Sequence, residues 1–425
     1  MSMNVNQIEQ IFLDTAYVRM GGRPEELKCA EYLLEKCKEI QQKCDKSGVS
    51  ANGIRAELTS FEVDLADIKE AKLYIDGREI VCKGYFNAGS STVEAPLYYL
   101  RGTDPYSLKH CQGTIVISDG GMGYWKYQDI VDNGAVGFIT YDGNANYADN
   151  DIDQKELRSY VSQGRILPGV NINAKDAIEI IKNGAKSAKI VLAQEEYKGQ
   201  SQNVILDMPG EIDEYIVLTA HYDSTSLSNG AYDNMSGSVG ILGIADYFAK
   251  NPHRYGLRFI WCGSEERGLL GSKAYCAAAG EEELKRIVLN VNLDMVGCIM
   301  GKFSCCCTSE EKMVHYMEYF ASEAGFAMSV NNDVYSSDST PFADKGIPAV
   351  TFSRSAPGNT ATIHNRYDTM DVMSAQQMLE DTEFIAAFVE RMANAKQCPV
   401  LREMPEKMKE KLDVYLCRKR DTQKK

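Results

Sequence analysis

Histidines and acidic residues follow apolar runs at several points in the second half of the chain. The run YIVLTAHYDS ends in His221 and Asp223, which lie two positions apart and therefore project to the same side of an extended chain. The run LRFIWCGSEE ends in the adjacent acids Glu265 and Glu266. A neutral imidazole is a good zinc ligand, and a carboxylate can hold its second nitrogen. Adjacent acids repel each other unless a metal neutralises one, which leaves the other free to take a proton.

Three further polar residues extend this pattern. Asp233 lies in the loop AYDNMSGS, Asp294 ends the apolar run IVLNVNLD, and His364 lies in the loop ATIHNRYD. Each alone has a structural explanation, such as an N-cap for Asp233. Together, two histidines and three carboxylates suit two zinc ions with one carboxylate bridging them. A two-metal site polarises a carbonyl group and generates hydroxide, which is the chemistry of amide hydrolysis.

The elements that must position these residues alternate between buried strands and helices from about residue 203. Continuous apolar strands with helices between them indicate an α/β fold whose sheet is parallel in large part and covered on both faces. Functional groups then lie at the carboxyl ends of the strands. We expect strands over 203–210, 215–223, 257–266, 287–297 and 349–354, and helices over 236–250, 268–279, 312–325 and 374–395.

The first half of the chain shows a different pattern of apolar and turn residues. Helical spacing of apolar residues predicts helices over 6–20 and 24–41, and alternation predicts strands over 56–65 and 70–77. Between about 93 and 198, short β-rich runs are separated by Gly and Asp turns, with two helices that end at Gly134 and Gly184. This pattern favours a compact β-rich module rather than the start of a parallel sheet.

Composition limits the classes of function. The chain has 425 residues, with 46 Lys and Arg against 60 Asp and Glu, and a formal net charge of −14. This balance argues against a general nucleic-acid binder, which needs a basic surface. We also find no membrane-spanning apolar run and no signal-peptide pattern at the start. The 13 cysteines include no CxxC pair and favour a reducing compartment, so we expect a cytoplasmic protein without a membrane or nucleic-acid partner.

Six motifs resemble, in their order and spacing, those of the zinc metallopeptidase family that contains bacterial leucine aminopeptidases, vacuolar aminopeptidases and glutamate carboxypeptidase. They are AHYDS, YDNMSGS, CGSEERGLLGS, NLDMVG, SSDSTPFADKGIPAV and IHNRYDTMD. The region 93–198, with GTIVISDGG, NGAVGFITYDG and ILPGVNI, resembles the protease-associated domain often inserted into these enzymes. The resemblance implies a mixed, largely parallel sheet sandwiched by helices, of the zinc exopeptidase type, with a β-rich insert. The implied division is a peptidase domain over 1–70 and 201–397, the insert with its flanking strands over 71–200, and a polar basic tail over 398–425.

The resemblance also implies a role for each residue of the pattern. Glu265 would be the general base that activates a water bridging two zinc ions, and Asp223 would orient one of the histidine ligands. The implied ligands are Asp233 as the bridge, His221 and Asp294 on one zinc, and Glu266 and His364 on the other.

Two departures from the family concern the substrate pocket. Many relatives have SDH where this chain has Ser337, Asp338 and Ser339, and some have Tyr where Ile363 stands. Tyr335 is a candidate substitute donor to the oxyanion. Separately, Arg354, just after an expected strand, could bind a substrate carboxylate.

The favoured function is a two-zinc exopeptidase, and within that class an aminopeptidase acting on peptides. Three alternatives stay open: a dipeptide carboxypeptidase on the same fold, a single-zinc enzyme similar to glutaminyl cyclases, and a non-catalytic binding protein on the same scaffold. The insert could restrict substrate length or mediate contacts in a homodimer.

Overall fold

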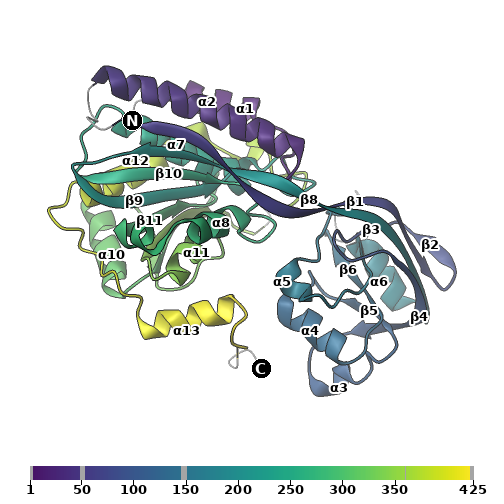
Figure 1. Cartoon of the computed structure of the whole chain (residues 1–425). Coiled ribbons are helices and arrows are strands. Elements are labelled where there is room, and N and C mark those ends of the chain that lie inside the picture. The colour runs from purple at the N-terminus through teal and green to yellow at the C-terminus, as the bar shows by residue number, and fades with distance from the viewer. Residues whose placement is uncertain (1–2, 48–52, 145–150, 359, 422–425) are drawn as a thin grey trace. The chain divides into compact units, whose positions relative to one another are not determined.

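A computed structural model describes residues 3–47, 53–144, 151–358 and 360–421 (Figure 1). The chain divides into two compact units, one formed by Met1–Phe61 with Gln200–Lys425 and the other by Glu62–Gly199. The predicted strands over 56–65 and 70–77 are one long strand, β1 (Arg55–Ile75), and the second unit begins within it, at residue 62. The strand that leads out of the second unit, β8 (Ser187–Met208), likewise contributes residues to both units.

The first unit is built on a mixed sheet with the strand order β13-β12-β14-β11-β9-β10-β8. Its central strands β10, β9, β11 and β14 run parallel to one another, while β8 pairs antiparallel with β10 and β12 pairs antiparallel with β14 and parallel with β13. The predicted α/β fold with a largely parallel sheet is therefore confirmed. The strands are β9 (Ile212–His221), β10 (Tyr255–Cys262), β11 (Ile287–Leu293), β12 (Lys302–Thr308), β13 (Ser329–Asn331) and β14 (Ala349–Ser355).

Helices cover both faces of this sheet, with α7 and α12 on one side and α8 and α11 on the other (Figure 1). Strand β10 shows why two layers form, because Phe259 and Trp261 join one core cluster and Ile260 and Cys262 the other. The helices are α1 (Val5–Asp14), α2 (Pro24–Ser47), α7 (Ser236–Phe248), α8 (Leu270–Ala278), α9 (Glu281–Arg286), α10 (Lys312–Ala324), α11 (Ser339–Asp344) and α12 (Ala375–Ala393).

The second unit corrects one expectation from the sequence. Its strands β4, β5, β6 and β7 form a parallel sheet, with β3 antiparallel to β7, so the prediction against a parallel sheet here was wrong. The two predicted helix ends are confirmed, since α4 and α6 are followed by Gly134 and Gly184 with positive φ. The bounds are β2 (Arg78–Ile80), β3 (Lys83–Gly84), β4 (Ser91–Leu100), β5 (Ile115–Ser118), β6 (Gly137–Asp142), β7 (Gly169–Asn173), α3 (Pro105–Leu108), α4 (Tyr124–Asp132), α5 (Ser159–Ser162) and α6 (Ala174–Lys182).

The segment predicted as a polar basic tail contains a docked helix, α13 (Glu406–Tyr415). Its buried Met408 and Leu412 form a small core cluster with Ala343 of α11. Beyond the helix, Arg418 forms a bidentate ion pair with Asp344 of α11, at 2.6 and 2.7 Å. The basic character of this segment is thus used in part to hold it against the first unit.

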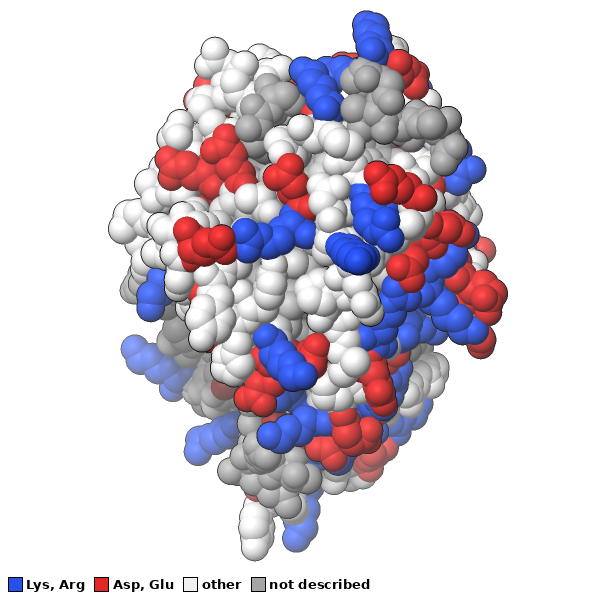
Figure 2. Space-filling view, turned by 90° about the vertical axis from the view of Figure 1, so that its left-hand side faces the viewer, with Lys and Arg blue, Asp and Glu red and all other residues white. Residues whose placement is uncertain are grey.

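The acidic excess is not gathered on the face of the molecule that Figure 2 shows. Acidic and basic side chains lie among one another there, separated by uncharged residues. Surface ion pairs such as Arg391 with Glu323 and Arg402 with Glu214 show how opposite charges are matched locally. Within the described part of the chain, we find no helix whose length and apolar character would let it cross a membrane.

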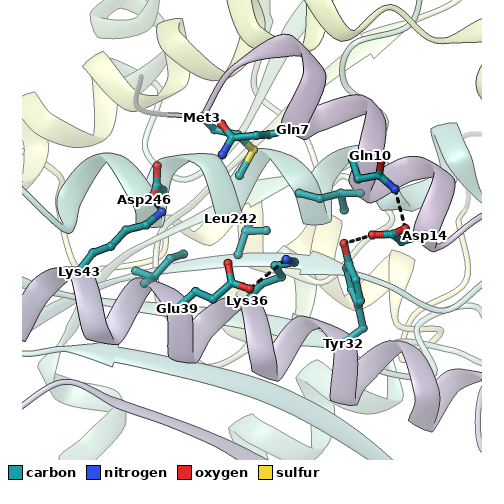
Figure 3. A pocket seen from close by; sticks show the side chains of 12 residues that line it. Met3, Gln7, Gln10, Asp14, Tyr32, Lys36, Glu39, Lys43, Leu242 and Asp246 are labelled. Carbon is teal, nitrogen blue, oxygen red and sulfur yellow. Dashed lines mark hydrogen bonds and ion pairs between the residues drawn. The ribbon is translucent and has the colours of Figure 1, made fainter.

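A small cavity of about 130 Å³ lies between α1, α2 and α7 (Figure 3). Its polar walls are made by pairs of side chains that bind each other, with Tyr32 2.9 Å from Asp14 and Lys43 2.5 Å from Asp246. Leu242 of α7 lies among the apolar residues between them. The first pair joins α2 to α1, and the second joins α2 to α7, the helix that follows the Asp233 loop.

The docking of α13 predicts the effect of one substitution. Leu412→Asp places a carboxylate in the apolar contact with α11, and a buried Leu contributes about 1.5–3 kcal/mol. We expect hydrogen exchange of the 406–415 amides to accelerate strongly while the sheet of the first unit keeps its protection. Glu410→Ala, on the exposed side of the same helix, is the control. Unchanged exchange in Leu412→Asp would show that α13 is held by other contacts.

Candidate metal centre

The ends of three strands and two loops bring the predicted site residues together. His221 is the last residue of β9, Glu265 and Glu266 follow β10, and Asp294 follows β11. Side-chain ligand atoms of His221, Asp233 and Asp294 lie within 4.8 Å of one another. A second group with the same spacing consists of Asp233, Glu266 and His364. The two groups that the resemblance implied as ligand sets are therefore both compact, and they share one carboxylate.

Asp233 lies between the two histidines and turns one oxygen toward each. Its Oδ1 is 3.1 Å from Nε2 of His221, and its Oδ2 is 3.1 Å from Nε2 of His364. His364 Nε2 is also 3.1 Å from Glu266 Oε2, while His221 Nε2 is 4.0 Å from Asp294 Oδ1. A carboxylate in this position can serve two cations at once.

Glu265 and Asp223 lie beside these groups without belonging to either. The Oε2 atom of Glu265 is 3.8 Å from Nε2 of His221. The Oδ1 atom of Asp223 is 3.4 Å from the other ring nitrogen, Nδ1. Asp223 also accepts hydrogen bonds from the backbone N–H groups of Glu265, at 2.9 Å, and Glu266, at 3.2 Å. One buried carboxylate thus touches the histidine and both acids of the pair.

The loop that carries Asp233 is tied to its surroundings by two side chains. Asp368 accepts hydrogen bonds from the backbone N–H groups of Tyr232, at 2.7 Å, and Asp233, at 3.2 Å. The side-chain amide of Asn234 donates to the carbonyl of Leu293 at 2.9 Å, and its oxygen accepts from the N–H of Met295 at 3.0 Å. Asn234 therefore joins the Asp233 loop to the two neighbours of Asp294.

The crowding of carboxylates shifts their proton affinities. Burial raises the pKa of Glu265 well above its usual range; His221 opposes this effect, and Asp338 and Glu266 add to it. Burial likewise raises the pKa of Asp294 to about 7, against the opposing charge of His221. Burial also disfavours the charged form of His364, but Glu266 and Asp233 outweigh it and raise its pKa to about 11. A bound cation would lower the pKa values of these acids again, because a nearby opposite charge favours the ionised carboxylate.

The donor set passes a simple test for a metal. Asp294 is buried, yet its Oδ1 has no hydrogen-bond partner among the described residues. A buried acceptor without a partner is costly, and a cation would satisfy it. Each group offers one imidazole nitrogen and two carboxylate oxygens, and three protein ligands of these types are usual in catalytic zinc sites. The residues present fit two divalent transition-metal ions.

The two candidate substrate residues have different surroundings. Tyr335 is half-buried, and burial and the nearby charge of Asp294 raise its pKa. Its hydroxyl group is therefore protonated, as a hydrogen-bond donor has to be. Arg354 instead binds the buried Asp381 through Nε at 2.8 Å and Nη2 at 2.5 Å, and donates to the carbonyl of Gly301 at 2.9 Å. The structure engages Arg354 in an ion pair of the fold rather than leaving its guanidinium for a substrate.

Sequence reasoning missed Arg19, which is fully buried. Its guanidinium binds only backbone carbonyl groups in the described contacts and holds two segments that carry site residues. The only local signal is a charged residue in the run YVRMGG, which does not reveal such distant partners. The acceptors are the carbonyls of Thr15, Tyr17, Tyr222, Asn229 and Gly230, at 2.6–3.1 Å.

Comparison with known proteins relates part of the chain to one family. A model described as peptidase family M28 matches residues 203–389, a range that includes both three-residue groups. Residues 203–389 are therefore similar to peptidase family M28. The prediction of a metallopeptidase is thereby confirmed, as is the resemblance drawn from the motifs. The match ends before α13 and does not include the second unit.

Curated proteins similar to this chain include aminopeptidase YwaD of Bacillus subtilis. It is 27% identical over 370 residues, which cover 82% of this chain and 79% of the relative. Leucine aminopeptidase 2 of Trichophyton equinum is 32% identical over 145 residues, which cover 34% of this chain and 26% of the relative.

Two solved structures share the fold. A zinc aminopeptidase from Bacillus subtilis has a TM-score of 0.74 at 23% identity, and the match covers 94% of this chain and 98% of that one. An aminopeptidase from Aneurinibacillus sp. strain AM-1 has a TM-score of 0.72 at 23% identity, with 94% and 96% covered. These likenesses extend over nearly the whole chain and support the mixed α/β architecture.

The surroundings of Arg354 predict a loss of stability rather than of substrate affinity. Arg354→Gln leaves the buried Asp381 without its cation, and breaking such a pair costs about 3–5 kcal/mol. We expect the free energy of unfolding in urea to fall by this amount, with KM for peptides unchanged in the folded protein. The control is Arg391→Gln, a change on the same helix as Asp381. It breaks the exposed pair of Arg391 with Glu323 and costs at most about 1 kcal/mol. A raised KM at unchanged stability would instead support substrate binding by Arg354.

Proposed function

We propose that the chain is an aminopeptidase that uses two zinc ions to hydrolyse the bond after the first residue of a peptide. The observation that carries this proposal is the position of Asp233, whose two oxygens each lie 3.1 Å from a different histidine. A single-metal enzyme does not need a carboxylate shared between two complete ligand sets. Two metals with a shared carboxylate suit the hydrolysis of an unactivated amide.

The proposed ligands follow from the two compact groups. His221, Asp294 and Oδ1 of Asp233 would hold one zinc ion. Glu266, His364 and Oδ2 of Asp233 would hold the other. When bound, the two ions supply a Lewis acid for the amide carbonyl and lower the pKa of a water molecule.

Glu265 is the proposed general base. It belongs to neither ligand group, and its carboxylate lies 3.8 Å from Nε2 of His221, beside the shared centre. Its Oε2 would take a proton from the attacking water and pass it to the leaving amine. Asp223 accepts a hydrogen bond from the backbone N–H of Glu265 and lies 3.4 Å from Nδ1 of His221. It would therefore hold the base and one metal ligand in fixed positions relative to each other. The half-buried Tyr335 would donate a hydrogen bond to the substrate carbonyl oxygen as charge develops there.

Electrostatics favours the amino end of a peptide over its carboxyl end. Once two ions occupy the ligand groups, Glu265 and Asp223 are nearby acids that bind no metal in this scheme, and they would attract a substrate ammonium group and repel a carboxylate. The carboxypeptidase alternative needs a cationic pocket, but Arg354, its clearest candidate in the sequence, is engaged by Asp381. The names of the relatives, which are aminopeptidases and leucine aminopeptidases, point the same way.

The roles of Glu265 and of the two metals can be tested together. We expect the zinc-loaded protein to contain two zinc ions per chain by elemental analysis and to lose activity on chelation. Glu265→Gln should keep both ions but lower kcat by roughly 10²–10⁴-fold, because the proton acceptor is removed. Glu281→Gln, an exposed change on α9, serves as the control. One tightly bound zinc, together with cyclisation of N-terminal glutamine, would instead establish the cyclase alternative.

A panel of substrates separates the peptidase alternatives. Aminoacyl chromogenic substrates and dipeptides with a free amino group should be cleaved, and the same dipeptides with a blocked amino group should not. The physical reason is the attraction between the acids that bind no metal in this scheme, such as Glu265, and the substrate ammonium group. Cleavage of only the blocked dipeptides would refute the aminopeptidase and support a carboxypeptidase, while a pure binding protein would cleave neither set.

A further inference from the structure

A buried carboxylate from the N-terminal part of the chain holds the turn that carries Glu265 and Glu266. Glu26 lies in the first turn of α2, and its side chain is fully buried. Its Oε1 accepts hydrogen bonds from the backbone N–H of Ser264, at 2.7 Å, and from the Ser264 hydroxyl, at 3.0 Å. Its Oε2 accepts from the backbone N–H of Gly22 at 2.6 Å. Glu26 thus joins the start of α2 to the residue just before the acid pair, 238 positions away.

The turn at Ser264 is one that needs to be held. Ser264 has a φ of 52°, in the left-handed region that residues with a Cβ seldom occupy. This conformation redirects the chain as it leaves β10. The next two N–H groups, those of Glu265 and Glu266, both point to Asp223. Three successive backbone donors therefore end on two buried carboxylates, and Glu26 holds the first of them.

Glycines permit the close approach that these hydrogen bonds require. A Cβ on Gly263 would lie 2.9 Å from Oε1 of Glu26 and 2.3 Å from the carbonyl of Gln202. A Cβ on Gly21 would lie 2.5 Å from the hydroxyl oxygen of Ser264. All three distances are too short for a Cβ atom, so a side chain at either position would displace its neighbours. The segment before α2 and the segment after β10 are thus shaped to bring Glu26 onto the turn.

We propose that Glu26 is a positioning residue that sets the geometry of Glu265 through the Ser264 turn. This inference rests on the proposed function, which assigns Glu265 as the general base. Proton transfer requires the base within hydrogen-bond reach of the water, and a displacement of about 1 Å can cost roughly a hundredfold in rate. Glu26 itself touches neither the ligand groups nor the base in the described contacts, so its effect is transmitted by the backbone.

Glu26→Gln is the sharpest test because it keeps the size of the side chain. Oxygen Oε1 can still accept from Ser264, but an amide NH₂ then faces the N–H donor of Gly22. The side chain has to rotate, and one of the two backbone donors loses its acceptor. Glu25→Gln is the matched control, since it removes the same charge from the adjacent, exposed position of α2.

The experiment measures kcat, KM and zinc content of the full-length, zinc-loaded variants, together with hydrogen exchange of the amides around 264–266. We expect Glu26→Gln to lower kcat roughly ten- to a hundredfold, with KM changed less than about twofold, full zinc content and faster exchange confined to the turn. Glu25→Gln should match the unaltered protein in every measurement. An unchanged kcat, or faster exchange spread over the whole core with loss of zinc, would overturn the positioning role. Should the unaltered protein cleave no peptide, the proposed function fails, while exchange at the turn still decides whether Glu26 holds it.

Discussion

The constraint on which the rest of the structure depends is the concentration of carboxylates around Asp233. Burial raises the pKa values of Glu265, Glu266 and Asp294, and neighbouring acids such as Asp233, beside Glu266 and Asp294, raise them further. In the protein alone, only the two histidines supply nearby positive charge within the ligand groups. Such an arrangement lowers the stability of the folded protein, and bound cations would offset this cost. The site is therefore strongly coupled to metal binding.

Buried acids near the site also hold the loops by accepting hydrogen bonds from their backbone N–H groups. Asp368 takes backbone donors from the Asp233 loop, Asp223 takes them from the acid pair, and Glu26 takes them from Ser264. Several residues near the site, among them Ser264, Met295 and His364, have positive φ values that free chains avoid. Hydrogen bonds from backbone N–H groups to buried carboxylates are strong, charge-assisted contacts, and they offset part of this strain. Acids that bind no metal in the proposed scheme thus stabilise the conformation of those that do.

The limits of prediction from the sequence follow from the range of each interaction. His221, Glu265 and Asp294 could be found because each ends a continuous apolar strand, and parallel strands meet at one edge of the sheet. Arg19 and Glu26 could not, since their partners lie some 200 residues away and no local pattern marks a buried ion. The parallel sheet of the second unit was missed because strands such as Ile115–Ser118 are only four residues long. Runs that short carry too little pattern to separate parallel from antiparallel pairing.

These contacts also bear on which part of the chain makes a working site. The M28 match spans 203–389, yet Arg19, outside that range, binds the carbonyl of Tyr222, next to His221, and that of Gly230, three positions before Asp233. Glu26 binds Ser264 from outside it as well, and α1 and α2 add their apolar residues to the same core as α7 and α12. A segment cut to the family match would leave the carbonyls of Tyr222 and Gly230 without their buried donor, and the Ser264 turn without its acceptor. The N-terminal segment is therefore part of the same structural unit as the candidate site, because Glu26 of α2 holds the Ser264 turn and Arg19, between α1 and α2, holds backbone carbonyls near His221 and Asp233.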